Sequence, residues 1–191
     1  MSTIDQQQQN GNGWTAIAGT SSTPDRKAVA QTFIPSLTAE IANIKTILRS
    51  VGNPSGNVKC EIYDDSGGDP NNLLAEADSQ QVATDINAEG EGAGWSEVNF
   101  AFTNGPTLFK GSLYHIVLSP SGVYTDWDSS NYVQWFTQNS DVTDSYSNGK
   151  SRKKDADNSW TDFPFYTYSD FYFAESVNIG YNSILPSFRR S

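Results

Sequence analysis

The chain has little of the chemistry on which many enzymes and metal sites depend. Its 191 residues include one cysteine, Cys60, and one histidine, His115. A single cysteine excludes an intrachain disulfide, and one cysteine with one histidine cannot make a usual zinc site. Because secreted chains of this size commonly carry paired cysteines, the sequence favours synthesis in a cytoplasm.

Basic residues and long apolar runs are also scarce. There are 12 lysines and arginines against 22 acidic residues, which gives a formal net charge of −10. This balance argues against nucleic-acid binding and against adhesion to anionic lipid, since both use a basic surface. The first residues lack the basic and apolar regions of a signal peptide, and no apolar run approaches the ~20 residues that span a bilayer. We therefore expect neither a nucleic-acid partner nor a membrane partner.

What the sequence does contain is a series of short alternating patterns separated by turns. In the clearest of them, Val58, Cys60 and Ile62 alternate with polar residues, as in a strand with one buried face. The residues on either side, 52–57 and 64–70, are rich in Gly, Pro, Asn and Asp, which chain reversals need. Many short strands and no helical pattern between them predict an all-β fold, an antiparallel β-sandwich over residues 14–177.

Three segments need separate interpretation. Residues 1–13 are polar and glutamine-rich, which predicts a flexible N-terminal arm, and residues 178–191 are interpreted as a C-terminal tail. Residues 37–51 are ambiguous, because their apolar residues recur at helical spacing whereas the following turn favours a hairpin. We interpret 43–51 as a strand.

Several motifs follow one another in a characteristic order over residues 31–176. They are Gln31-Thr32-Phe33, the turn 51–57, the strand and turn 61–70, Leu73-Leu74-Ala75, and the segments 95–102, 113–119, 131–135, 158–160 and 170–173. Together they resemble a recurrent jelly-roll module of bacterial surface proteins and phage structural proteins. The resemblance implies a jelly-roll sandwich, similar in architecture to carbohydrate-binding modules and generally non-catalytic. The chain departs from the pattern at the basic segment 150–154 and in the C-terminal extension.

Catalytic residues are not evident in the sequence. His115 lies in mid-strand, and there is no Gly-x-Ser-x-Gly motif to place a nucleophile beside it, so a packing role is the expected one. Paired carboxylates would serve glycoside hydrolysis, but no pair stands out among the acidic residues. We expect no enzymatic activity and assign no catalytic residue.

A metal site is the one cofactor that the sequence leaves open. Asp64, Asp65 and Asp69 surround two glycines, and carboxylate oxygens on a tight loop are ligands that Ca²⁺ uses. The loop lacks the regular spacing and terminal Glu of an EF-hand. Turn-forming aspartate is the commoner explanation, and bound calcium is the alternative.

A group of aromatic residues is the candidate for glycan binding. Exposed Trp and Tyr rings beside amides and carboxylates bind sugars through stacking and hydrogen bonds. The alternative is that these aromatics fill the core. The residues are Tyr124, Trp127, Tyr132, Trp135 and Tyr146.

The C-terminal tail is more apolar than a solvated tail needs to be. We interpret its large side chains and terminal arginines as assembly contacts: Tyr181, Ile184, Leu185, Phe188, Arg189 and Arg190. The sequence thus predicts a non-catalytic virion structural protein of a bacteriophage, made in the host cytoplasm: a capsid decoration, head-fibre or tail/adhesin subunit. It would be a homo-oligomer that binds neighbouring virion proteins through its termini. The alternative is a carbohydrate-binding module that recognises bacterial surface glycan.

Overall fold

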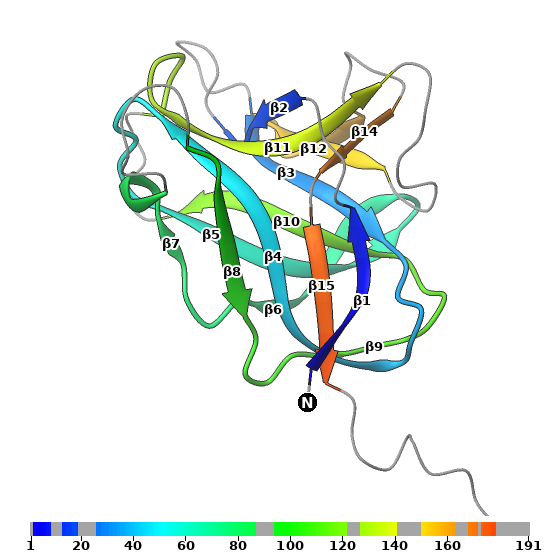
Figure 1. Ribbon diagram of the computed structural model, residues 1–191. Coiled ribbons are helices and arrows are strands. Elements are labelled where there is room, and N and C mark those ends of the chain that lie inside the picture. The colour runs from blue at the N-terminus through cyan, green and yellow to red at the C-terminus, as the bar shows by residue number, and fades with distance from the viewer. Residues whose placement is uncertain are drawn as a thin grey trace, which may run out of the picture.

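In the computed structural model the regular elements of the described residues are β-strands and one short 3₁₀ turn (Figure 1). The structure describes residues 2–8, 13–18, 26–86, 94–121, 127–140, 150–162, 168–171 and 173–178. The elements are β1 (Ser2–Gln8), β2 (Gly13–Ala16), β3 (Arg26–Phe33), β4 (Ala39–Val51), β5 (Asn57–Ser66), β6 (Asp69–Glu76), β7 (Gln81–Val82), the 3₁₀ turn η1 (Ala83–Asp85), β8 (Ser96–Ala101), β9 (Thr107–Leu108), β10 (Tyr114–Ser121), β11 (Tyr132–Ser140), β12 (Ser151–Asp155), β13 (Trp160–Asp162), β14 (Tyr168–Phe171) and β15 (Phe173–Asn178). Across these ranges no helix is long and apolar enough to cross a membrane.

The strands form two antiparallel sheets that pack against each other. In the eight-stranded sheet the order is β1-β15-β4-β11-β14, with β2 paired to β11 and with β8 and β9 paired to β4. In the seven-stranded sheet the order is β13-β12-β3-β10-β5-β6, with β7 paired to β5. The predicted all-β antiparallel sandwich is confirmed, and the jelly-roll topology stays a prediction.

The core lies between the sheets and follows from the alternation of side chains along each strand. On β5, Val58, Cys60 and Ile62 are all buried, as the pattern predicted. Burial raises the pKa of the Cys60 thiol well above its usual value, so this side chain is a small apolar filler. The largest fully buried side chains are Trp135, Phe33, Phe100, Phe173, Ile17, Ile41, Ile44, Leu48, Ile62, Ile86 and Leu108.

The ambiguous segment is a strand, β4, and a bulge accounts for its helix-like spacing. Val177 of β15 pairs with Ile41, but Ser176 pairs with Asn43, so one extra residue, Ala42, stands in β4. The extra residue turns Ile41 and Ile44 toward the same side, and both are fully buried. A three-residue step between buried residues therefore arises here without a helix.

The turns before and after β5 have the backbone that their composition indicated. Gly52 and Gly56 have φ of 67° and 74°, and Gly67 has φ of 68°. These values lie in the left-handed region, where glycine bears no steric penalty from a Cβ atom. The turn at 52–57 thus links β4 in one sheet to β5 in the other.

Within residues 1–13, for which the sequence predicts a flexible arm, the structure has a strand over Ser2–Gln8. These residues form β1, which pairs with β15 from Ser2 opposite Asn178 to Gln8 opposite Phe173. Main-chain N–H and C=O groups make this ladder, so a polar, glutamine-rich sequence can occupy a sheet edge. Asn178, assigned to the tail, is the last residue of β15, and the rest of the tail lies outside the described residues.

The basic segment 150–154, where the sequence departs from the modules that it resembles, is a regular part of the sheet. It forms β12, which pairs with β3 on one side and with β13 on the other. The turn between β12 and β13 includes Asn158 at a φ of 71°, a value that Asn tolerates better than most residues. Residues 155–159 therefore form the tip of a hairpin between β12 and β13.

Candidate functional site

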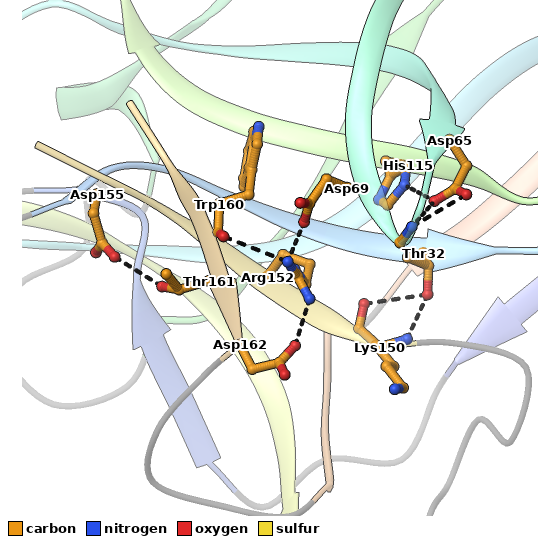
Figure 2. Close-up of polar contacts among 11 residues, drawn as sticks. Thr32, Asp65, Asp69, His115, Lys150, Arg152, Asp155, Trp160, Thr161 and Asp162 are labelled. Carbon is orange, nitrogen blue, oxygen red and sulfur yellow. Dashed lines mark hydrogen bonds and ion pairs between the residues drawn. The ribbon is translucent and has the colours of Figure 1, made fainter. Parts of the chain in front are cut away.

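A cluster of charged and polar side chains lies on the outer face of the seven-stranded sheet (Figure 2). On β10, Tyr114, Ile116 and Leu118 belong to the core, so the alternating residue His115 faces outward. Asp65 comes from the end of β5, next to β10 in the sheet. The site is therefore built from strand alternation on neighbouring strands.

His115 forms the most buried contact of the cluster. Its side chain is 0% exposed, and Nε2 lies 2.8 Å from Oδ1 of Asp65. Because a carboxylate oxygen accepts, Nε2 carries the hydrogen and Nδ1 is the unprotonated nitrogen. Within the described ranges, Nδ1 is buried without a hydrogen-bond partner. Burial lowers the pKa of His115 below its usual value, against the opposing effect of Asp65, so the ring is neutral at neutral pH.

Asp65 belongs to the tip of the β5–β6 hairpin. Hydrogen bonds to the acidic side chains of this hairpin stabilise its tip. Asp65 Oδ1 accepts a hydrogen bond of 3.1 Å from the main-chain N–H of Gly68. Asp64 accepts bonds of 2.6 Å from the main-chain N–H and 2.9 Å from the side-chain amide of Asn72. These bonds lower the pKa of Asp64. The aspartates at this tip thus do what turn-forming aspartates do.

Arg152, on β12, joins the hairpin tip to β13. Its Nη2 donates to Asp69 at the start of β6, and its Nη1 donates to Asp162 on β13 over 2.6 Å. Nη2 also lies 3.4 Å from the carbonyl oxygen of Trp160. The Arg152 side chain is 15% exposed, whereas Asp69 and Asp162 are 41% and 72% exposed, so a largely buried arginine reaches two carboxylates at the surface. We call the five residues His115, Asp65, Arg152, Asp69 and Asp162 the outer-face clamp.

The clamp lies beside a small apolar cluster on the same face of the sheet. Ala28, Ala30 and Val117 are almost fully buried, and the half-buried rings of Tyr63 and Trp160 pack against them. The ammonium group of Lys154 lies 5.7 Å from the centre of the Trp160 ring, within the range of a cation–π contact. Both the aromatic rings and the clamp therefore cover a face that would otherwise expose apolar side chains.

The polar bonds of the clamp join neighbouring strands to each other. His115 is bonded to Asp65, and a substrate has no exposed imidazole to contact because the ring is fully buried. The nearby hydroxyl of Thr32 donates to the carbonyl oxygen of Lys150 over 3.2 Å and accepts from its N–H. Each of these polar groups connects two strands or a strand and a loop.

The three candidate calcium ligands do not converge on one point. Asp64 is bonded to Asn72, Asp65 to His115, and Asp69 to Arg152. Throughout the described part of the chain, no group of three His, Cys, Asp or Glu side chains is placed to hold a metal ion. The arrangement accounts for all three aspartates as turn and clamp residues.

The candidate sugar-binding tryptophans belong to the core. Trp135 is 0% exposed and Trp127 is 5% exposed, so neither offers a ring face to a sugar. The indole N–H of Trp127 donates to the carbonyl oxygen of Ser55 over 2.6 Å, which satisfies its one donor. Tyr132 is half-buried on β11. Tyr124 and Tyr146 lie outside the described residues, as do the candidate assembly contacts at 181–190.

The sequence did not reveal Arg152 or Trp160 as parts of the outer face. Alternation along β5 and β10 did carry a signal, since it places Asp65 and His115 opposite the apolar residues. It could not show that β12 pairs with β3, because Thr32 and Lys150 are 118 residues apart. No family model and no curated protein matches this chain. The resemblance to jelly-roll modules therefore stays a prediction.

Proposed function

We propose that this protein is a non-catalytic structural subunit of a bacteriophage particle. A β-sandwich provides the rigid body, and the segment after Asn178 contacts neighbouring virion proteins. The resemblance to jelly-roll modules of phage structural proteins motivates the proposal. The order of the motifs over residues 31–176 is the sequence evidence for it.

The structural observation behind the proposal is the end of the sandwich at which β1 and β15 meet. Ser2 and Asn178 are paired, so the first described strand is bound to the last one along its length (Figure 1). β15 is in turn paired with β4, a central strand of 13 residues. The chain therefore continues into residues 179–191 from a firmly held point, as a contact arm requires.

The outer-face clamp supports the non-catalytic part of the proposal. Catalysis needs an acid, base or nucleophile that a substrate can touch. The only histidine is fully buried, and the charged groups around it are paired between strands. Carbohydrate binding, the alternative function, stays a prediction, and two of its five aromatic residues, Trp127 and Trp135, are core residues.

Incorporation into particles tests the proposal. Particles would be assembled with the wild-type chain or with a variant carrying Ile184→Ser, Leu185→Ser and Phe188→Ser, and the amount of subunit per purified particle would be measured by mass spectrometry. We expect the variant to be lost from particles and a control in the same segment, Asn182→Ser, to be retained. Equal incorporation of all three chains, or a wild-type chain that never accompanies particles, would refute the proposal.

A further inference from the structure

Two loops at one end of the sandwich carry exposed apolar side chains. The loop 34–38, between β3 and β4, and the loop 109–113, between β9 and β10, are held together by two hydrogen bonds. Gly111 N–H donates to the carbonyl oxygen of Pro35 over 3.0 Å, and Lys110 N–H donates to the hydroxyl of Thr38 over 2.9 Å. These joined loops carry Leu37, 41% exposed, and Phe109, 59% exposed. We call Leu37 and Phe109 the Phe109 patch.

The backbone holds Phe109 on the outside. Leu108, the residue before it, is fully buried and pairs with Ala39. The main-chain N–H of Phe109 donates to the phenolic oxygen of Tyr114 over 3.0 Å, which fixes the start of the loop. Phe109 is the most exposed large apolar side chain in the described part of the chain. Two exposed apolar side chains on loops that are bonded to each other are a feature of interaction sites.

The patch lies at the end of the sandwich from which the C-terminal segment departs. Asn178, the last residue of β15, pairs with Glu40 on β4, and Glu40 pairs with Thr107 on β9. With strands about 4.8 Å apart, Asn178 is roughly 10 Å from Thr107, two residues before Phe109. Both β9 and β15 run antiparallel to β4, so both lead the chain toward this end (Figure 1).

The segment that follows has the composition of a ligand for an apolar patch. Residues 179–191 contain five large apolar side chains, the first of them Ile179, and their only charged side chains are two arginines on a chain of net charge −10. The two aromatic rings alone would bury about 150–250 Å² each, a substantial part of the roughly 800 Å² per partner in a specific interface. Fully extended, a segment of this length reaches roughly 45 Å, far enough to contact a neighbouring molecule. The residues concerned are Tyr181, Ile184, Leu185, Phe188, Arg189 and Arg190.

We infer that the C-terminal segment of one copy of this chain binds the Phe109 patch of a second copy. The inference rests on the proposed function and names the partner of the contact segment. A second copy is favoured over the same molecule because a particle subunit, as proposed above, needs contacts that join molecules, and because β15 ends at the edge of the sandwich (Figure 1). Each copy then has one donor segment and one acceptor patch, so the contact is head-to-tail and forms rings or chains of subunits.

Complementation between two full-length variants tests this inference. The patch variant carries Leu37→Ser and Phe109→Ser and keeps its C-terminal segment. The segment variant carries Ile184→Ser, Leu185→Ser and Phe188→Ser and keeps its patch. Molar mass would be measured by light scattering at high protein concentration, for the wild type, for each variant alone, and for an equal mixture of the two variants.

Head-to-tail binding predicts a distinctive pattern of masses. The wild type should exceed the mass of one chain, each variant alone should have the mass of one chain, and the mixture should approach twice that mass. Val82→Ser, which changes a 42% exposed apolar residue elsewhere, is the matched control and should behave as the wild type. Circular dichroism would show that both variants keep their strands, since all five substitutions lie at exposed positions or after β15.

A wild type with the mass of one chain, or a mixture that does not recombine, would overturn the inference. Its failure can be told apart from failure of the proposed function. If the wild type is monomeric in solution and the segment variant is still lost from particles, the segment contacts a different virion protein, and only the inference about the Phe109 patch is wrong.

Discussion

Mild acid should destabilise the folded protein through His115. The unfolded chain takes up a proton at the usual histidine pKa of 6.5, whereas the pKa of His115 in the folded protein is lowered by burial. Between those two values the unfolded state binds more protons, so the free energy of unfolding falls as the pH falls. This contribution to the free energy of unfolding is fully present above pH 6.5. It decreases progressively as the pH falls from 6.5 to the pKa of His115 in the folded protein.

The structure explains why the proton is unfavourable. Nε2 of His115 already donates to Asp65, so the proton must be added at Nδ1, which is buried without a partner in the described ranges. The Arg152 guanidinium adds a further unfavourable charge. Because His115 takes up a single proton, it can change the free energy of unfolding by at most about 1.4 kcal/mol per pH unit.

Urea denaturation from about pH 7 to about pH 5 would measure the effect. In His115→Gln an amide N–H can still reach Asp65 but cannot titrate, so we expect the slope with pH to disappear. Acidic residues with a lowered pKa, such as Asp155 and Asp157, lose their contribution only below their usual value of 3.8 and do not overlap this window. A wild type without a slope, or an equal slope in His115→Gln, would refute the reasoning.

Three further substitutions test the core, a turn and the clamp by the same denaturation assay. Trp135→Ala should cost about 3–5 kcal/mol, because the ring is 0% exposed; a change below about 1 kcal/mol would contradict its place in the core. Gly52→Ala should cost more than Gly67→Ala, since both have positive φ but only at Gly52 would a Cβ overlap a neighbouring carbonyl oxygen; equal costs would contradict this. Arg152→Met should lower the free energy of unfolding by about 1–2 kcal/mol. Lys153→Met, on the same strand, should lower it by less, because only Arg152 of the two bonds carboxylates on other strands. The reverse order would disprove the clamp.

The sequence predicts those features that local patterns determine. Alternation at Val58, Cys60 and Ile62 identifies both a strand and its buried face, and composition identifies the turns beside it. In β4 the local pattern was misleading, because a bulge at Ala42 produces the spacing of a helix. The strand interpretation succeeded there through the turn at Gly52.

Features that depend on distant pairing could not be predicted. Ser2–Gln8 is polar and was expected to be an arm, but its main chain pairs with β15 near the other end of the chain, for example Gln6 with Glu175. Only the folded structure brings these two segments together. Trp127 and Trp135 have the same chemistry in a core as on a sugar-binding surface, and only the packing of the folded chain decides which applies. Trp135 lies on β11 between β2 and β4, and Trp127 donates to the carbonyl oxygen of Ser55.

The pairing of β3 with β12 has a consequence for synthesis. The bonds between Thr32 and Lys150 cannot form until Lys150, 118 residues later, has been synthesised. At about 5–20 residues per second a ribosome needs roughly 6–24 s to make the intervening chain. During that interval Arg152 has not been synthesised, so the β5–β6 hairpin tip lacks the bond between Arg152 and Asp69. The apolar cluster that includes Ala28 and Ala30 is then open to water. The nascent protein therefore passes through a period in which one face of its sheet exposes apolar side chains, and this period ends only when about four fifths of the chain has been made.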